Sequence, residues 1–360
     1  MKDNKNLKKI CLIISSLRHG GSERVMSELA NFWCEKKNVE INLILLTRQE
    51  KFYNIDPRIN LIEPHRSYKK NIISKILYKL WIIKFIRKKC IEIEPHSILS
   101  FNERYNNIVL LSLLGTKLRI FVSDRNNPYM DIGRIHNFLR NKLYFFATSI
   151  IAQTETAKKV LKINTKNNNI IVIPNPLRKI KEIKNNKTKK IILNVGRNVP
   201  QKNQLELLEI FSKCDYKDWK LKVFGNGPLH KELIQKVRDL NLEENVQILE
   251  FSKDIDLHYS QASIFAFSSL YEGFPNALVE AMAHGIPCVS YDCPTGPRDI
   301  INNGKNGDLI ELKNKAQFID KLSNLMKSTE LRIIYSKEAI KVKEKYSLKL
   351  VTNKYFNFIS

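Results

Sequence analysis

The sequence predicts an α/β protein that contains two doubly wound parallel β-sheets. Short apolar runs alternate with amphipathic segments along its 360 residues, a pattern typical of successive strand–helix units. The alternation stops once, near the middle of the chain, and then resumes. A chain of this length also exceeds one ordinary core and suits two domains of about 150–200 residues each.

The expected strands are short runs rich in Val, Ile, Leu and Phe, because helices cover a parallel strand on both faces. In the first half they cover residues 10–14, 41–45, 97–101, 119–122 and 149–152. In the second half they cover residues 191–195, 221–224, 246–249, 264–267, 287–290 and 308–310. Helical patterns fill most of the gaps, so each half predicts its own parallel sheet.

A linker is expected between the two halves. Pro174 and Pro176 begin it, and the lysine-rich stretch 179–190 continues it with little apolar periodicity. We therefore expect an N-terminal Rossmann-like domain at residues 1–178 and a C-terminal one at residues 179–346. Residues 347–360 form a final amphipathic helix.

The composition limits the class of protein. Hydrophobic residues make up 43% of the chain, which is normal for a globular protein, and the formal net charge is +25. That charge favours contact with an anionic surface, either a membrane or a nucleic acid. The six cysteines are scattered without a C-x-x-C pair, which indicates reduced thiols in a cytosol. The N-terminus leads into a strand rather than a signal sequence, and no apolar run approaches the ~20 residues of a membrane span. We expect a cytoplasmic protein, dissolved or peripheral at the inner face of the membrane.

The most informative segment is residues 271–283, YEGFPNALVEAMA, which holds two carboxylates eight residues apart. A helix that opens after Gly273-Phe274-Pro275 presents free backbone N–H groups and the positive end of its dipole, which suits a phosphate. Neighbouring carboxylates accept hydrogen bonds from sugar hydroxyls. Either Glu272 or Glu280 alone would be explained by the helix dipole or a solvated face, but the whole run is too specific for that explanation.

This run resembles the E-x7-E motif of family 4 glycosyltransferases, which are retaining enzymes of the GT-B fold. The resemblance implies that Glu280 accepts the ribose hydroxyls of a nucleotide-sugar and that Glu272 meets the hydroxyls of the transferred sugar. It also implies that the backbone of the segment Gly273, Phe274, Pro275 and Asn276 holds sugar and phosphate through its N–H groups, of which Pro275 has none. In this fold the last helix crosses back to the N-terminal domain, and the resemblance extends that expectation to residues 347–360.

A basic loop follows the expected strand 191–195. Gly196 permits a close backbone approach, while Arg197 and Lys202 are placed to clamp a diphosphate in place of a metal ion. The segment resembles the G-R-x4-K segment of the same family, whose Arg and Lys bind the donor pyrophosphate. Taken alone, basic residues at a strand–helix turn are common. We expect no metal and no cofactor, since the nucleotide-sugar is a substrate.

Two further segments fit a donor site. Gly225 and Gly227 end a strand with a glycine-rich turn that matches the family's G-x-G-P loop near the nucleotide, although both also suit an ordinary turn. Glu250 and Phe251 match the segment whose backbone reads the base. The D-x-D pattern at Asp254 and Asp256 is read as a helix N-cap rather than a metal site.

The N-terminal half is expected to bind the acceptor. Gly20 and Gly21 follow the first strand, where glycine allows a left-handed bend and a close approach to the backbone. The segment resembles the family's Gly-Gly-x-Glu-Arg loop, which faces the donor phosphate, and His19 beside it is a candidate phosphate contact. Glu23 equally suits the first turn of a helix.

Asp124, Arg125 and Asn126 follow the expected strand 119–122. Many family members have a histidine near here, whereas this chain resembles a subgroup with Ser-Glu-Arg-Asn, in which Asp124 is shorter by one methylene. Arg125 and Asn126 are candidate acceptor or donor contacts, or else caps of the loop.

The segment 66–89 carries nine Lys and Arg residues and no acid, interleaved with apolar residues that include Trp81. Such a helix can lie on an anionic leaflet, gaining roughly 1 kcal/mol per basic residue near the surface. It can also pack its apolar face on the sheet and leave the lysines in water.

Together these features predict a retaining hexosyltransferase. The donor is a UDP-linked hexose or N-acetylhexosamine, with a galactose-type or GalNAc donor favoured, and the acceptor is a lipid-linked saccharide of surface polysaccharide, capsule, exopolysaccharide or lipopolysaccharide synthesis. The alternatives are a nucleotide-sugar epimerase or phosphorylase on the same scaffold, or a basic nucleic-acid or membrane-binding protein without catalysis. The sequence shows no nucleic-acid readout motif, so nucleic acid is not an expected partner.

Overall fold

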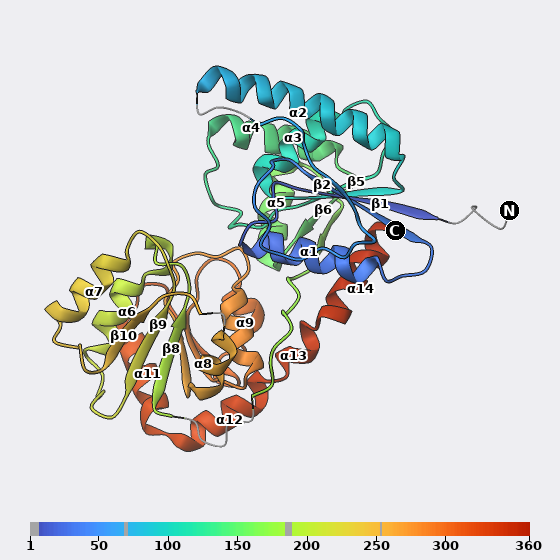
Figure 1. Cartoon of the computed structure of the whole chain (residues 1–360). Coiled ribbons are helices and arrows are strands. Elements are labelled where there is room, and N and C mark those ends of the chain that lie inside the picture. The colour runs from blue at the N-terminus through green and yellow to red at the C-terminus, as the bar shows by residue number, and fades with distance from the viewer. Residues whose placement is uncertain (1–6, 68–70, 184–188, 253) are drawn as a thin grey trace. The chain divides into compact units, whose positions relative to one another are not determined.

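The computed structural model describes residues 7–67, 71–183, 189–252 and 254–360, and it divides into two compact units. Unit 1 comprises residues 1–176 and 348–360, and unit 2 comprises residues 177–347. Figure 1 shows that each unit is a sheet with helices on both faces. Leu177, Arg178 and Ser347 fall in unit 2, whereas the sequence placed them with the N-terminal domain. The backbone N–H of Leu177 donates to the Tyr346 carbonyl at 2.7 Å, which holds this segment in unit 2.

Unit 1 has a seven-stranded parallel sheet in the order β3-β2-β1-β4-β5-β6-β7. Its strands are β1 (Lys8–Ile14), β2 (Val39–Leu45), β3 (Asn60–Ile62), β4 (Ser97–Phe101), β5 (Ile120–Ser123), β6 (Ser149–Ala152) and β7 (Ile170–Val172). The chain reverses its winding direction between β1 and β4. The carboxyl ends of the strands at such a switch point are where α/β proteins bind ligands.

The unit 1 sheet has a helical layer on each face. One layer contains α2 (Ile72–Ile93), α3 (Glu103–Leu113), α4 (Arg134–Leu143) with the short η1 (Tyr144–Phe146), and α5 (Glu155–Thr165). The other contains α1 (Gly21–Trp33) and α14 (Leu348–Ile359). Alternate residues of β1 enter the two cores: Cys11 and Ile13 face the α2 layer, and Ile10, Leu12 and Ile14 face the α1 layer. The last helix, α14, thus completes the core of unit 1.

Unit 2 has a six-stranded parallel sheet in the order β10-β9-β8-β11-β12-β13. Its strands are β8 (Ile191–Val195), β9 (Lys220–Phe224), β10 (Val246–Leu249), β11 (Ile264–Phe267), β12 (Cys288–Tyr291) and β13 (Gly307–Ile310). The switch point here lies between β8 and β11, the strands that precede the Gly196 loop and the Glu272 loop.

Unit 2 also buries its sheet between two helical layers. The helices α6 (Gln204–Phe211), α7 (His230–Asp239), α11 (Lys315–Lys327) and α12 (Thr329–Ala339) share one core. The helices α8 (Ile255–Gln261), α9 (Asn276–Ala283), α10 (Pro297–Ile300) and α13 (Val342–Lys345) share the other. The short η2 (Pro200–Lys202) leads into α6.

All eleven expected strands are present, with ends that differ by two residues at most. The edge strands β3 and β7 were not expected. Each has only three residues, which is too short to stand out as an apolar run. Each gains its pairing from one neighbour only, β2 and β6 respectively.

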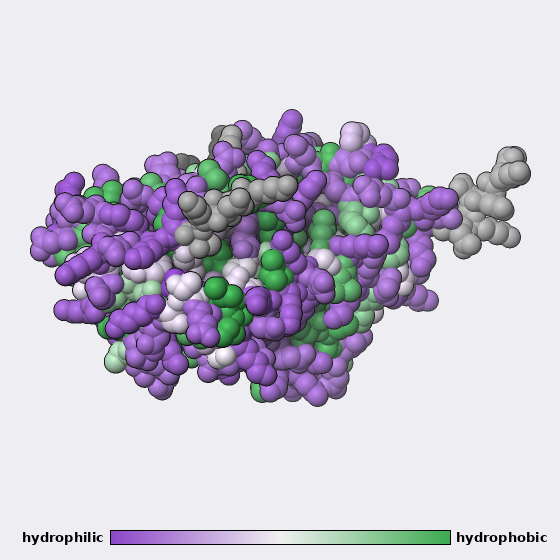
Figure 2. Space-filling view, turned by 90° about the horizontal axis from the view of Figure 1, so that it is seen from below, coloured by the Kyte–Doolittle hydropathy of each residue, from purple (hydrophilic) through white to green (hydrophobic). Residues whose placement is uncertain are grey.

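The surface is predominantly polar. Figure 2 shows a face on which hydrophilic side chains cover most of the area and hydrophobic ones form smaller patches. None of the helices in the described part of the chain combines the length and apolar character that a membrane crossing requires. All six cysteines are free thiols, and five of them are buried.

Candidate active site

The core of the candidate site is a pair of glycine loops at the carboxyl ends of β8 and β9. The Gly196 N–H donates to the Phe224 carbonyl at 2.9 Å, and the Asn198 side-chain amide donates to the Gly225 carbonyl at 2.8 Å. A Cβ atom on Gly225 would lie 1.8 Å from the Gly196 carbonyl oxygen, and one on Gly227 would lie 2.4 Å from that of Asn198. Both glycines also have positive φ, so backbone contact and backbone conformation together require glycine.

Lys202 and Glu272 meet at this loop pair. The Lys202 Nζ lies 2.6 Å from Glu272 Oε1, and their side chains are only 16% and 7% exposed. The Lys202 stem passes over Gly196, since a Cβ there would lie 3.2 Å from the lysine Cδ and Cε atoms. A nearly buried ammonium–carboxylate pair beside two glycine loops is suited to a ligand that carries both phosphate and sugar hydroxyls.

The helix α9 begins at Asn276, as the sequence predicted, with Pro275 at the position before it. Pro275 packs on Gly296, where a Cβ would lie 2.4 Å from the proline Cδ. The Thr295 hydroxyl donates a short hydrogen bond to the Glu272 carbonyl. The Phe274 side chain is buried in the core and meets the Tyr346 ring edge-on at 5.6 Å between centroids. Phe274 therefore offers a ligand its backbone and not its ring.

Glu280 lies one turn into α9 and contacts an arginine from the start of unit 2. The Arg178 Nε lies 3.1 Å from Glu280 Oε2, and the same guanidinium binds both carboxylate oxygens of Asp256. Asp254 precedes α8 but makes no side-chain cap hydrogen bond, so the expected N-cap is wrong in that detail. Asp256 is held instead by Arg178 and by the Lys181 N–H at 3.1 Å.

The remaining donor candidates, Arg197, Glu250 and Phe251, are exposed. Arg197 is exposed, and its guanidinium has no ion-pair or hydrogen-bond partner among the residues that the structure describes. Glu250 is also exposed. The Phe251 N–H donates to Asn226 Oδ1 at 2.8 Å, which ties this segment to the glycine loop.

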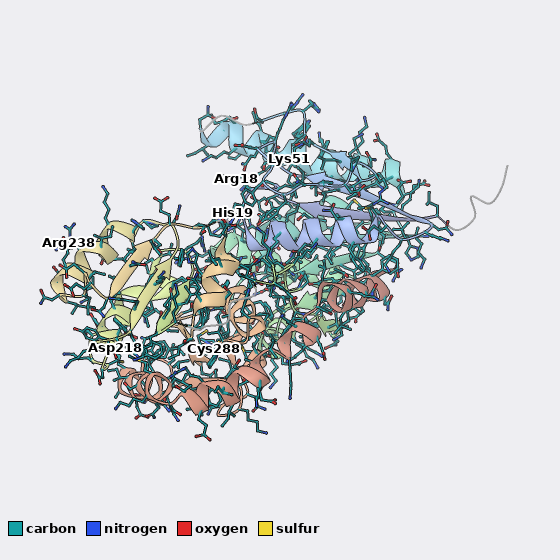
Figure 3. All side chains as sticks on the ribbon, turned by 60° about the horizontal axis from the view of Figure 1, so that its bottom comes forward. Arg18, His19, Lys51, Asp218, Arg238 and Cys288 are labelled. Atoms are coloured by element: carbon teal, nitrogen blue, oxygen red, sulfur yellow. The ribbon has the colours of Figure 1, made fainter. Side chains whose placement is uncertain are left out.

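In unit 1 the Gly20 loop also follows the carboxyl end of its strand, β1, and Figure 3 labels Arg18 and His19 of this loop. The expected left-handed bend is wrong: φ of Gly20 is 179°, and Gly21 is the first residue of α1. A Cβ at position 20 would lie 2.2 Å from Glu23 Oε2, which stands at the end of a flexible side chain that can move aside. Burial raises the pKa of Glu23. His19 meets the Phe52 ring edge-on at 4.8 Å.

Asp124 lies in a buried polar cluster at the end of β5. It accepts hydrogen bonds from the Tyr144 hydroxyl and from the Asn106 amide, and Arg140 NH1 lies 3.8 Å away. Burial, with a contribution from the negative charge of Glu103, raises the pKa of Asp124 to about 7. The structure gives this carboxyl internal partners rather than an open path to a substrate.

Arg125 and Asn126 occupy different environments. The buried Arg125 donates to the Tyr355 hydroxyl of α14 at 3.0 Å and to Asn175 Oδ1 at 2.6 Å, so it ties three segments of unit 1 together. The Asn126 side chain is exposed and donates to Glu103 Oε2 at 2.8 Å. Glu103 also accepts from the backbone N–H groups of Arg125 and Asn126, which fixes this loop.

In unit 2 the structure brings together Gly196, Lys202, Gly225, Gly227, Glu272 and the start of α9, all of which the sequence predicted for the donor site. Sequence reasoning missed Glu103 and Arg178. Glu103 was detectable, because it follows a predicted strand at the same sheet edge as Asp124. Arg178 was not, because 78 and 102 residues separate it from Asp256 and Glu280. No cluster of three or more His, Cys, Asp or Glu side chains suited to a metal ion occurs among the described residues.

Comparison with known proteins identifies the class of protein. Residues 177–342, which contain the whole glycine-loop and Glu272 arrangement, match the family model for glycosyl transferases, group 1. An amylovoran biosynthesis glycosyltransferase of Erwinia amylovora, AmsD, is 27% identical over 363 residues, covering 98% of this chain and 99% of that protein. The chain is a glycosyltransferase. Its two parallel-sheet units are those of the GT-B fold.

Two further comparisons bear on this glycosyltransferase. A Campylobacter jejuni relative is named N-acetylgalactosamine-N,N'-diacetylbacillosaminyl-diphospho-undecaprenol 4-alpha-N-acetylgalactosaminyltransferase. It is 27% identical over 347 residues, covering 92% of this chain and 94% of the relative. The structure of HepE from Anabaena in complex with UDP aligns with a TM-score of 0.78 and 15% identity, covering 98% of this chain and 99% of HepE. At that identity the likeness concerns the fold.

Proposed function

We propose that this glycosyltransferase is a retaining enzyme of family 4 that moves a hexose or N-acetylhexosamine from a UDP-sugar to a lipid-linked saccharide. The proposed setting is surface polysaccharide synthesis at the cytoplasmic face of the membrane. The observation that carries the proposal is the Lys202–Glu272 pair at 2.6 Å beside two contacting glycine loops and the start of α9. It places a cation, a carboxylate and helix N–H groups together, as a sugar diphosphate requires.

In this proposal the protein supplies the counter-charge for the diphosphate. Lys202 and the exposed Arg197 both follow β8, and the N-terminus of α9 adds its dipole. Together they would stabilise negative charge as it grows on the leaving diphosphate, which is usually the largest electrostatic contribution to such a reaction. We therefore propose catalysis without a metal ion, and activity that persists in EDTA.

The proposed step breaks the bond between the anomeric carbon and the donor diphosphate oxygen. The acceptor hydroxyl oxygen forms its new bond on the same face of that carbon, and its proton passes to the departing phosphate oxygen. Glu272, held by Lys202, accepts hydrogen bonds from hydroxyls of the transferred sugar and so orients the ring. Proton NMR of the first product would show retained anomeric configuration, and an inverted product would refute this mechanism.

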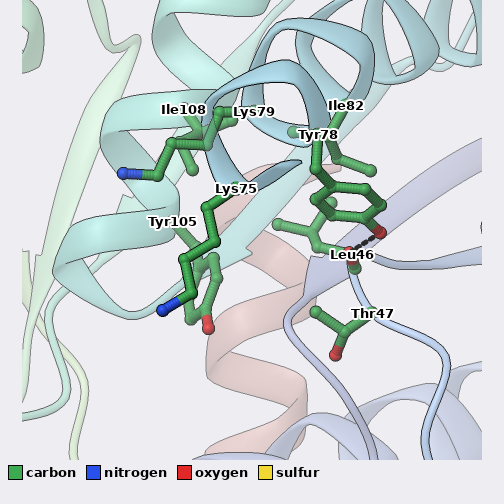
Figure 4. A pocket seen from close by; sticks show the side chains of 8 residues that line it. All are labelled: Leu46, Thr47, Lys75, Tyr78, Lys79, Ile82, Tyr105 and Ile108. Carbon is green, nitrogen blue, oxygen red and sulfur yellow. Dashed lines mark hydrogen bonds between the residues drawn. The ribbon is translucent and has the colours of Figure 1, made fainter. Parts of the chain in front are cut away.

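A pocket in unit 1 is suited to the acceptor. A cavity of about 200 Å³ lies beyond the carboxyl end of β2, between α2 and α3 (Figure 4). Its apolar wall includes Leu46, Ile82 and Ile108, and Tyr78 donates to the Leu46 carbonyl at 2.8 Å. Lys75 and Lys79 both extend toward the Tyr105 side of the pocket (Figure 4). Apolar walls with two ammonium groups suit a molecule that joins a lipid to a phosphate-linked saccharide. Undecaprenol appears in the name of the Campylobacter relative.

The helix α2 also presents a membrane-facing candidate, although not through Trp81. That ring packs inward, stacked on Phe85 at 5.1 Å and edge-on to His65 at 4.9 Å. The exposed apolar residues occupy the first turns of the helix, each at least 53% exposed: Ile72, Ile73, Ile76, Leu77 and Leu80. Apolar side chains among lysines are typical of helices that lie in the lipid headgroup region.

The donor assignment is tested by thermal unfolding without metal in UDP, GDP and ADP. Saturation at about 100 times Kd adds ~2.7 kcal/mol, so UDP is expected to raise the melting temperature more than the other two nucleotides. Glu280→Ala is expected to reduce the shift, because it removes the proposed contact to the ribose. No shift with any nucleotide would refute the transferase proposal.

The acceptor assignment is tested with an undecaprenyl-diphosphate-linked saccharide. Lys75→Gln is expected to raise KM for this acceptor about tenfold, because it loses a charge-assisted hydrogen bond, and to leave KM for the donor unchanged. Lys84→Gln on the exposed side of the same helix is the matched control. An equal rise in both variants would contradict the pocket assignment.

The membrane contact is tested by sedimentation with phosphatidylglycerol vesicles. Ile76→Glu is expected to reduce binding strongly, because it places a carboxylate among lipid headgroups. Ile333→Glu in α12 is an equally exposed control in unit 2 and is expected to bind as the wild type does. Binding that Ile76→Glu leaves unchanged would exclude α2 as the contact.

A further inference from the structure

Arg178 joins two carboxylates at the edge of the proposed donor site. Its NH1 and NH2 groups bind the two oxygens of Asp256 at 3.0 and 2.6 Å, and its Nε lies 3.1 Å from Glu280 Oε2. The side chains are 20%, 7% and 14% exposed for Arg178, Asp256 and Glu280. One planar guanidinium thus spans α8 and α9 with all three of its nitrogens.

The neighbours of this cluster leave Arg178 as its main positive charge. His284 lies 3.4 Å from Asp256 Oδ1, its ring stacks on Tyr259, and its Nδ1 lies 2.8 Å from the Glu280 carbonyl oxygen. Burial lowers the pKa of His284, so its ring is neutral near pH 7. Burial alone would raise the pKa of Asp256, but hydrogen bonds and charge from Arg178 hold it below the ordinary value. Without Arg178, both carboxylates would lose their ion-pair partner.

The geometry leaves one oxygen of Glu280 available. Arg178 contacts Oε2, and no hydrogen bond or ion pair is given to Oε1 by any residue in the described ranges. A carboxylate fixed through one oxygen presents the other in a defined direction. Two vicinal hydroxyls can donate to it, whereas a sugar with one hydroxyl removed loses a charge-assisted hydrogen bond.

We propose that Arg178 is a positioning residue that orients Glu280 toward the donor ribose and thereby sets the preference for a ribonucleotide over a 2′-deoxyribonucleotide. This inference rests on the proposed function, since it requires a nucleoside diphosphate at Glu280. Arg178, the second residue of unit 2, would then be a further residue that determines donor specificity. Lysine cannot replace it, because a single ammonium group cannot hold two carboxylates in one plane.

The experiment compares the Kd of UDP with that of 2′-deoxy-UDP by isothermal titration calorimetry. The wild type is expected to bind UDP at least about tenfold more tightly, the order of a hydrogen bond to a charged group. Arg178→Gln and Arg178→Lys are expected to reduce that ratio to about threefold or less. Glu280→Gln is expected to remove it, and Arg178→Gln is expected to cause no further loss in the Glu280→Gln background.

The controls separate positioning from general stability. Arg58→Gln breaks a matched arginine–aspartate fork with Asp56 in unit 1 and is expected to leave the ratio unchanged. Asp256→Asn weakens the hydrogen bonds that hold the NH1 and NH2 groups of Arg178. It is expected to lower the ratio of the two dissociation constants, and it serves as the test should Arg178→Gln fail to fold. UDP binding with an unchanged ratio in the folded Arg178 and Asp256 variants would overturn this inference and leave the proposed function standing. Failure of the wild type to bind UDP would overturn both.

Discussion

Replacing Gly225 with alanine is expected to separate the two glycine loops of the candidate site. The new Cβ would lie 1.8 Å from the Gly196 carbonyl oxygen, whereas carbon–oxygen contacts are normally about 3.3 Å or longer. The loops must therefore move apart by roughly 1.5 Å. That movement strains the hydrogen bonds from Gly225 N–H to the Leu249 carbonyl and from the Asn198 amide to the Gly225 carbonyl, both 2.8 Å long.

The expected loss of stability in Gly225→Ala has two contributions. The backbone conformation costs about 1–3 kcal/mol with a side chain present, and one weakened hydrogen bond costs about 1 kcal/mol. The expected total is ~2–4 kcal/mol, or roughly 5–15 °C in the melting temperature for a unit of this size. The affinity for UDP is expected to fall as well, because the displaced loops border the proposed diphosphate site.

Gly304→Ala is the matched control in the same unit. Gly304 has a φ of 74°, and a Cβ there would meet no atom within 4 Å. It is expected to cost only about 1 kcal/mol and to leave UDP affinity unchanged. Differential scanning calorimetry and UDP titration of both variants make the comparison. Equal losses in the two variants would refute the argument that the loops are in backbone contact.

Three other substitutions are expected to have measurable effects. Lys202→Met leaves the nearly buried Glu272 without its partner, so calorimetry should show a loss of about 3 kcal/mol, most of it restored by adding Glu272→Gln. Trp33→Phe removes the hydrogen bond to the Thr352 carbonyl (3.0 Å) and should lower the stability of unit 1 by about 2 kcal/mol in urea unfolding, with no change in UDP binding. Asp124→Asn tests the pKa of about 7: the folded protein binds a proton that the unfolded chain releases above pH ~4, so wild-type stability should fall by at most about 4 kcal/mol between pH 4 and 7. The substituted asparagine cannot ionise, so an equally steep fall in this variant would assign the pH dependence elsewhere.

Local patterns in the sequence predicted the features that depend on nearby residues. The apolar runs located every long strand, and Pro275 followed by Asn276 located the start of α9. The spacing of Gly196 and Lys202 also placed the lysine on the correct loop, because a strand, a turn and a short helix fix its position within seven residues.

Features that depend on distant residues were not predictable in the same way. The backbone of Gly20 is extended and lies against the Glu23 carboxylate, whereas the sequence indicated a left-handed bend. Trp81 is half-buried although the segment 66–89 around it is rich in lysine and arginine, because Tyr78, Phe85 and His65 provide aromatic partners. The Arg178 fork depends on two helices that lie far along the chain. These features depend on packing between residues that are distant in the chain, and a single sequence does not show such contacts.

The hydrogen bond from Leu177 to Tyr346 has a consequence for biosynthesis. It brings the first and last segments of unit 2 side by side, so that unit 2 is inserted between residues 176 and 348 of unit 1. A ribosome completes unit 2 before it delivers α14, whose Tyr355 and Ile359 fill the α1 core of unit 1. One apolar face of the unit 1 sheet therefore stays incompletely covered until residues 348–360 have been synthesised. A truncation that removes α14 would therefore destabilise unit 1, the unit whose synthesis began first.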